Sequence, residues 1–167
     1  MTPLELALDI TPRARLDVID VRTGASARYG DALAGYSRCL YHSPHTTAGY
    51  LPQSLASRLA ARGEGLEHYL DLFKTVFPER AGYRHDQMEL RDELEPAQRE
   101  VEPINGDSHL AFIAGGLHSC VSYANRRPGP VYFIDLDGMN GATPRRRATT
   151  LVGYRSEEHT SELQSRF

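Results

Sequence analysis

Three histidines of this chain lie next to small or polar residues, in stretches that suit neither a helix interior nor a hydrophobic core. His45 lies in PHTTAG, His85 in YRHD and His109 in NGDSHLA. Loops held by a rigid scaffold commonly carry functional residues. Three converging imidazoles would form a metal site with an open coordination position, as in a catalytic centre. The spacing leaves two interpretations open: such a metal site, or separate surface and core histidines.

Acidic neighbours would help two of these histidines to act as ligands. Asp86 directly follows His85, and Asp107 comes shortly before His109. Carboxylates in such positions orient imidazole rings by accepting their second N–H. His109 is also expected at the start of a helix, where the positive end of the helix dipole disfavours the imidazolium and keeps the ring neutral. Asp86 therefore joins His45, His85 and His109 as a candidate catalytic residue.

Basic and hydroxyl side chains near the histidines are candidates for binding an anionic substrate. Arginine forks suit bidentate contacts with phosphate, and hydroxyl groups add further donors. The alternative is that the arginine triplet is the solvated start of a strand and that the threonines only shape a turn. The candidate substrate-binding residues are Thr46, Thr47, Arg84, Arg145, Arg146 and Arg147. A small phosphorylated molecule is the substrate class that these side chains fit.

These candidates must be positioned by strands and by the loops at their ends. Alternating apolar residues predict a strand over residues 4–10, and residues 15–22 are expected to be its hairpin partner. A third strand over 36–41 runs into the loop that carries His45, because Pro44 biases the preceding residue away from helix. Further strands are expected over 118–123, 131–136 and 148–154.

Helical periodicity appears in the middle of the chain. The spacing predicts helices over residues 51–63 and 66–77 and a short Ala-rich helix over 25–35. The apolar segment 109–117 is expected to be a buried helix, capped by Asp107 or Ser108. Residues 86–103 are acidic and lack periodicity, so they are interpreted as a long connection that serves as a lid or binding loop.

Composition limits the class of protein. The 167 residues are 40% hydrophobic and 25% charged, as in one ordinary globular domain. A formal net charge of -3 without a basic face argues against nucleic acid as a partner. The longest apolar run, over 110–117, is far shorter than the ~20 residues that span a bilayer, so no membrane association is expected. The start of the chain does not resemble a secretory signal, and a cytoplasmic location with reduced Cys39 and Cys120 is expected.

The last residues differ in character from the rest. RSEEHTSELQSRF is polar, lacks apolar periodicity and is similar to the translated reading frame of a sequencing-library adapter. We therefore interpret residues 1–154 as the domain and 155–167 as a non-native tail, which removes His159 from the candidate residues. Re-sequencing of the source locus is expected to give a different C-terminus.

The order of the motifs carries a family resemblance. HTTAG after a strand, then YRHD, then DSH opening an apolar helix, then IDLDG and RRRATTLVGY resemble the YjbQ family over residues 3–154. Members of that family are described as secondary thiamine-phosphate synthases. The resemblance implies an α+β fold in a single domain, with an antiparallel or mixed β-sheet core packed by a few helices. It also implies a homotrimer in which His45, His85 and His109 bind a metal near a subunit boundary.

Two departures indicate a divergent member of that family. An Asn-Glu pair usually follows the HTTAG-like motif, whereas this chain has Tyr50 and Leu51 there, and it has no tryptophan. The implied reaction joins a pyrimidine pyrophosphate to a thiazole phosphate, and cationic groups would stabilise the leaving pyrophosphate. The imidazoles favour zinc or another transition metal, while pyrophosphate chemistry makes Mg²⁺ possible. The alternatives are a metal-dependent hydrolase of a small phosphorylated substrate and a non-catalytic small-ligand or assembly protein.

Overall fold

Two antiparallel sheets form the centre of the fold. A computed structural model describes residues 2–127 and 129–155. The first sheet has the order β1-β9-β3-β5, with β1 at Leu4–Ile10, β9 at Arg147–Tyr154, β3 at Arg38–His42 and β5 at Cys120–Ala124. The second has the order β2-β6-β4, with β2 at Asp17–Asp20, β6 at Tyr132–Asp135 and β4 at Ala48–Tyr50. A small hairpin pairs β7 (Met139–Asn140) with β8 (Thr143–Pro144).

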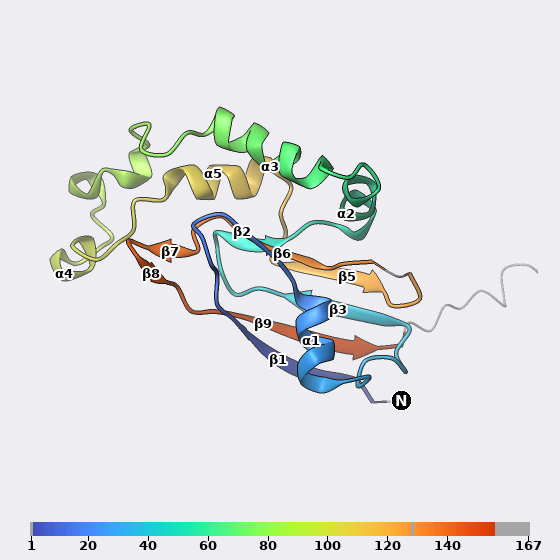
Figure 1. The fold of residues 1–167 in the computed structure, drawn as a ribbon. Helices are drawn as coiled ribbons and strands as arrows, with labels where there is room; N and C mark the ends of the chain where they lie inside the picture. Colours follow the sequence, from blue (N-terminus) through green and yellow to red (C-terminus); the bar gives the residue numbers. More distant parts are fainter. Residues whose placement is uncertain (1, 128, 156–167) are drawn as a thin grey trace, which may run out of the picture.

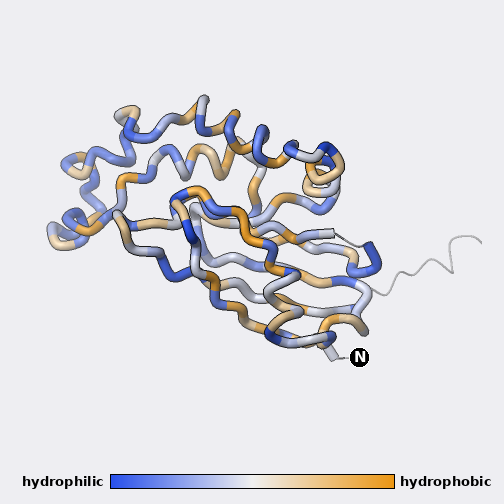
Figure 2. Tube along the Cα trace, viewed as in Figure 1, coloured by the Kyte–Doolittle hydropathy of each residue, from blue (hydrophilic) through white to orange (hydrophobic). Residues whose placement is uncertain are grey.

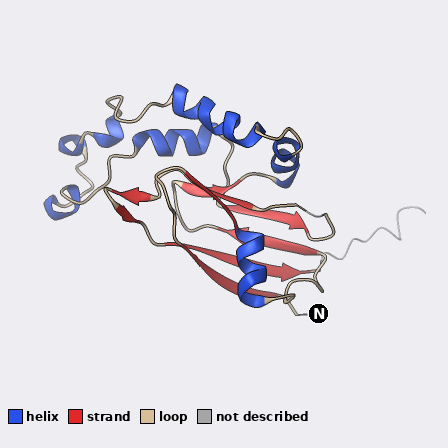
Figure 3. Ribbon diagram, viewed as in Figure 1, coloured by secondary structure: helices blue, strands red, loops and turns tan. Residues whose placement is uncertain are grey.

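Most helices lie in one layer over the sheets (Figures 1 and 3). The long helices of this layer are α2 (Gln53–Ala60), α3 (Gly65–Val76) and α5 (Gly106–Ala114). The connection from α3 to α5 holds only short turns, η1 (Arg84–Asp86), η2 (Met88–Leu90) and α4 (Pro96–Arg99). Helix α1 (Val21–Tyr29) lies apart from this layer, against β1 and β6 (Figure 1). The expected α+β fold in a single domain is confirmed.

The core is formed by alternate residues of the first sheet and by consecutive residues of β4 and β6. Tyr41, Tyr50 and Phe133 are almost completely buried, and their rings meet at tilted or edge-on angles. Such contacts add to the stabilisation from buried apolar area. Figure 2 shows hydrophobic residues distributed along the strands and along α3 and α5, while the connection around α4 is mainly hydrophilic. None of the described helices is long and apolar enough to cross a membrane.

The predicted hairpin between residues 4–10 and 15–22 is wrong. β1 pairs with β9, with Leu4 opposite Gly153, and β2 pairs with β6. The second segment also ends early, because the Asp20 side chain accepts a hydrogen bond from the backbone N–H of Arg22 and caps α1 there. The helix predicted over 25–35 therefore begins at Val21 and ends at Tyr29, before Gly30 with its positive φ of 58°.

Two further differences lie near the histidines. The residues after His45 were expected to form a loop, but Ala48–Tyr50 is strand β4, and a Cβ on Gly49 would come within 2.6 Å of the His118 carbonyl oxygen. The apolar helix expected over 109–117 begins at Gly106 with Asn105 as its N-cap, so the predicted caps are wrong. It is also not a buried helix, since Ile113 is 74% exposed.

Both cysteines are free thiols, as expected. Cys39 is buried in β3, and Cys120 is exposed at the start of β5. Burial raises the pKa of the Cys39 thiol to about 11, so it stays protonated near neutral pH.

Candidate functional site

His85 and His109 form the centre of the candidate site. His85 comes from η1 and His109 from the first half of α5, and their ring centroids are 4.6 Å apart at an interplanar angle of 42°. Both side chains are partly buried. The fold thus brings two of the three predicted histidines together, although a long segment separates them in the sequence.

Asp86 holds this pair in place. Its Oδ1 accepts hydrogen bonds from the backbone N–H groups of Asn105 at 3.1 Å and Gly106 at 2.8 Å. The same oxygen lies 3.3 Å from His85 Nδ1. The first N–H groups of a helix have no partner within the helix, so a carboxylate here satisfies them and is favoured by the dipole. Gly106 is required at this point, because a Cβ would come within 2.8 Å of Tyr83 Cβ.

Arg91 closes the other side of His85. Its Nη1 lies 3.4 Å from His85 Nε2, and the guanidinium is held by Glu93 at 2.6 Å and Glu102 at 3.2 Å. A guanidinium can only donate hydrogen bonds, so Nε2 is the acceptor and the Nδ1 proton points to Asp86. The lone pair of Nε2 therefore faces Arg91, which must swing away before Nε2 can bind another group.

His109 is set up as a neutral imidazole. Burial lowers its pKa, and the neighbouring His85 lowers it further, while Asp137 acts in the opposite direction. A neutral ring offers one nitrogen lone pair to a proton or a metal ion. The lowered pKa agrees with the expectation of a neutral His109, and burial is the largest of the causes found.

His45 lies on the sheet side and uses one ring nitrogen for structure. Its Nε2 accepts a hydrogen bond of 3.0 Å from the backbone N–H of Ala148, and its ring contacts the edge of Phe133 at 6.5 Å between centroids. Burial and the nearby Arg147 lower its pKa. Only Nδ1 remains for another partner.

The structure does not gather the three predicted histidines into one ligand set. Among residues 2–127 and 129–155, no group of three His, Cys, Asp or Glu side chains could hold a metal ion. The neighbourhood of the histidine pair nevertheless contains unused acceptors. Asp86 Oδ2 and Asn105 Oδ1 are buried without a hydrogen-bond partner in the described chain. Such atoms normally meet water or a ligand, and oxygen acceptors suit a cation or a donor. Both oxygens therefore remain available to a donor beside the histidine pair.

The predicted substrate-binding residues divide into buried and exposed groups. Arg147 is buried and donates to Asp135 at 2.7 and 2.9 Å and to the Asp137 carbonyl oxygen at 2.6 Å. Thr47 is also buried, 3.4 Å from an Arg147 nitrogen. Arg145 lies 3.3 Å from Asp137. The exposed members of the set are Thr46, Arg84 and Arg146.

Three residues of this region were missed from the sequence. Arg91 lies in the aperiodic connection, where no pattern places it. Asn105 donates from Nδ2 to Asp137 at 2.7 Å, and Arg15 makes a two-pronged contact of 2.8 and 2.9 Å with Asp107. The Asn-Gly pair at 105–106 was a usable signal, since asparagine is a preferred N-cap residue. Arg15 lies far from Asp107 along the chain, and no local pattern links them.

Comparisons with known proteins support the fold. No protein-family model matches the chain, and no curated protein matches it. A hypothetical protein from Aeropyrum pernix K1 is similar in structure, with a TM-score of 0.58 at 17% identity over 92% of this chain and 99% of that one. A YbjQ-like protein of unknown function from Sulfolobus solfataricus P2 gives 0.60 at 17% identity, over 91% and 96%.

A third similar structure is an uncharacterized conserved protein of the YjbQ/UPF0047 family from Clostridium acetobutylicum. Its TM-score is 0.52 at 16% identity, and the match covers 87% of this chain and 97% of that one. At such low identity the likeness shows the fold. The chain therefore has the α+β fold of YjbQ-like proteins over nearly its whole described length.

Proposed function

We propose that the chain is a divergent member of the YjbQ family and acts as a secondary thiamine-phosphate synthase. Support comes from the order of its motifs and from a fold that matches a YjbQ-like structure over 91% of this chain. The observation that carries the proposal is the pair of His85 and His109. Their ring centroids are 4.6 Å apart, and Asp86 orients the His85 ring. These residues come from distant parts of the sequence, so their meeting is a property of the fold.

The residues of the site have separate roles in this reaction. The ring N–H of a neutral His109 donates a hydrogen bond to an oxygen of the leaving pyrophosphate, and Asp86 keeps the His85 ring oriented. The exposed Arg84 and Arg146 contact the phosphate groups of the substrates, where positive charge stabilises the leaving pyrophosphate. Arg147 acts indirectly, because its guanidinium is already bound to Asp135. It positions the strand end that carries its exposed neighbour Arg146.

A divalent metal ion belongs to this proposal. His85 and His109 would hold it, with Asp86 Oδ2 nearby as an unused acceptor. His45 has Nδ1 free for a third bond, but the described residues of one chain do not bring it into the same group. When bound, such an ion neutralises charge on phosphate oxygens. The nitrogen donors favour zinc or another transition metal over Mg²⁺. Arg91 would have to leave His85 Nε2, which makes metal binding by His85 dependent on the connection.

A metal-dependent hydrolase is the second candidate. The observation that favours it is the buried Asp86 Oδ2, which lacks a hydrogen-bond partner in the described chain and can orient a water beside the histidine pair. A hydrolase would release phosphate from either substrate alone, whereas the synthase requires both. The two reactions are therefore distinguished by their products.

We also propose that the protein is cytoplasmic and forms a homotrimer. Leu110 and Ile113 lie on the exposed side of α5, and Ile113 is one helical turn after His109. An apolar surface next to the site would be covered by a neighbouring subunit. Light scattering of the wild-type chain is expected to give three times the chain mass. The substitution Ile113→Glu is expected to give a folded monomer, and an unchanged mass would contradict this interface.

The decisive experiment measures thiamine phosphate formed from the two substrates. His85→Ala and His109→Ala are expected to lose at least about 100-fold in activity, as for removal of a group that stabilises charge in the transition state. His68→Ala is the matched control, since His68 is 75% exposed on α3. Complementation of a thiamine-requiring strain that lacks its ordinary synthase gives a second readout. Growth that survives His85→Ala would overturn the proposal.

Metal content tests the proposed metal site separately from the proposed synthase activity. Elemental analysis of the gently purified protein is expected to show one transition metal per site, reduced at least about 10-fold by His109→Ala. His45→Ala then decides whether the third imidazole is a ligand. Full occupancy in that variant would remove His45 from the metal site and leave the histidine pair intact.

A further inference from the structure

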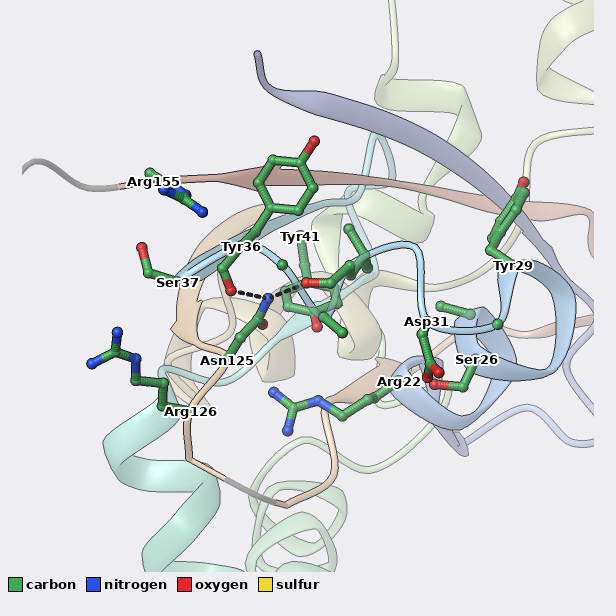
Figure 4. Close-up of a pocket in the computed structure, with 15 residues that line it drawn as sticks. Arg22, Ser26, Tyr29, Asp31, Tyr36, Ser37, Tyr41, Asn125, Arg126 and Arg155 are labelled. Atoms are coloured by element: carbon green, nitrogen blue, oxygen red, sulfur yellow. Dashed lines mark hydrogen bonds between the residues drawn. The ribbon is translucent and has the colours of Figure 1, made fainter. Parts of the chain in front are cut away.

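A cavity lies away from the histidines. It has a volume of about 650 Å³ and is bordered by α1, the following segment 30–37 and the end of β5 (Figure 4). None of its lining residues belongs to the site of His85 and His109. Sites for small organic ligands typically occupy about 300 to 1,000 Å³, so this cavity has the size of a binding site.

The charge of the cavity favours an anion. Arg22 and Arg126 line it together with a single acid, Asp31. Arg155 also lines it, but it begins the segment predicted to be non-native, and nothing below rests on it. Figure 4 shows Arg22 and Asp31 on one side of the cavity and Arg126 on the other.

Arg22 borders the cavity with a guanidinium that is held on two sides. Its Nη1 donates to the Arg127 carbonyl oxygen at 3.1 Å. The guanidinium also acts on the Tyr41 hydroxyl, as a side-chain hydrogen-bond partner and as a positive charge, and both effects oppose the rise that burial causes in the pKa of that hydroxyl. Arg22 is thus fixed at the inner wall.

Aromatic rings and apolar side chains form another part of the wall. Tyr29 and Tyr36 use their hydroxyls as donors to the backbone carbonyls of Ala7 and Thr2, which fixes both rings. Leu33 and Ala34 add apolar surface between them. A wall of this kind packs against the face of a flat ring.

The wall is already ordered in the free chain. Asn125 donates from Nδ2 to the carbonyl oxygens of Leu33 at 3.2 Å and Tyr36 at 3.1 Å. Its backbone N–H donates to Ser37 at 2.9 Å. These bonds, two of them drawn in Figure 4, attach the segment after α1 to the end of β5. A preformed wall lowers the entropy lost when a ligand binds.

We propose that this cavity binds a small anion that carries a flat ring, of the class of nucleoside monophosphates, with its phosphate on Arg22 and its ring against the tyrosines. The inference is independent of the proposed synthase. It assigns a ligand site to the α1 side of the molecule, whose residues take no part in the histidine site.

The test titrates the full chain with adenosine monophosphate and uses calorimetry and backbone NMR shifts as readouts. Adenosine and inorganic phosphate, each titrated alone, are expected to bind at least 10-fold more weakly, because each makes half of the contacts. Arg22→Gln is expected to weaken binding of the monophosphate at least 10-fold, or about 1.4 kcal/mol. Arg58→Gln, at an exposed position of α2 outside the cavity, is the matched control and should leave binding unchanged.

A second pair of variants tests the cavity without changing charge. Ala34 is exposed and lines the cavity, whereas Ala32 is exposed and does not. Ala34→Trp is expected to abolish binding by filling the space, and Ala32→Trp to leave it intact. Absence of binding by the wild-type chain at millimolar ligand would overturn the proposal, as would equal loss in both tryptophan variants. Loss of binding in His85→Ala would place the ligand at the histidine site and would also overturn it.

Discussion

The candidate histidines lie in two regions of the fold that are built differently: the sheet wall, with His45 and Arg147, and the His85 wall, formed by the connection over residues 77–105. On the sheet side, His45 is next to a buried polar network in which Arg147 binds Asp135, a residue with no exposed surface. On the other side, His85 lies in the connection over residues 77–105, where apolar side chains such as Val101 remain 75% exposed. One wall is fixed by buried charge pairs, and the other is held mainly by Asp86 and Arg91.

This difference predicts which of the two regions moves more easily. Buried, hydrogen-bonded charges define one arrangement, because any displacement leaves a charge unpaired in the interior. Segments with few buried apolar contacts open at low free energy and supply the moving parts of binding sites. We therefore expect His45 to keep its position, and His85 and Arg91 to adjust when substrate or metal binds.

The largest effect should follow from breaking the fixed wall. Arg147→Met removes the partner of Asp135 and leaves a buried carboxylate unpaired, which is expected to cost about 3 to 5 kcal/mol of the free energy of unfolding. Urea denaturation followed by circular dichroism measures this loss. His45 should also lose its position, because Ala148, whose N–H binds its ring, adjoins Arg147.

Arg146→Met is the matched control for this variant. Arg146 precedes Arg147 but is exposed, so its loss should change stability by less than about 0.5 kcal/mol. Activity should fall in the control if Arg146 binds phosphate. Equal stabilities of the two variants would mean that the sheet wall is not held by the Arg147 and Asp135 pair.

An intermediate effect is expected at the anchor of the connection. Asp86→Ala leaves the N–H groups of Asn105 and Gly106 without their acceptor, and about 1 to 3 kcal/mol of stability should be lost. Hydrogen exchange should localise the change to η1 and the start of α5. Asp86→Asn keeps an oxygen acceptor and should recover part of the stability, while the lost charge still weakens any metal site.

Exchange that stays slow in Asp86→Ala would show that other contacts hold the connection. The claim that Asp86 anchors the His85 wall by joining η1 to α5 would then be wrong.

The fold class was readable from the sequence because its strongest signals are local. Alternation marked β1, and helical spacing marked α3, whose bounds at Gly65–Val76 lie within one residue of the prediction. Pairing was not readable, because the partner of β1 is the last strand, which no local pattern indicates. Val21 illustrates the remaining ambiguity: it suits a strand, yet the Asp20 cap starts a helix there.

For a related reason, the sequence predicted some residues of the candidate site but not the contacts that position them. Residue types and motif order identified His85, Asp86 and His109, which do meet. The bond from Ala148 to His45 and the contact of Arg91 with His85 depend on how distant backbones approach one another. No residue type or spacing encodes such an approach, so these contacts required coordinates.

The smallest effect should come from the exposed apolar surface of the connection. Val101→Ser removes an apolar side chain that is 75% exposed, so the free energy of unfolding should change by less than about 0.5 kcal/mol. Denaturation at two protein concentrations tests this directly, because a residue covered by another subunit gives a loss that depends on concentration. A loss above about 1 kcal/mol would show that Val101 is buried in the assembly. The connection would then be fixed by subunit contact, and the His85 wall would be as rigid in the oligomer as the sheet wall is in the single chain.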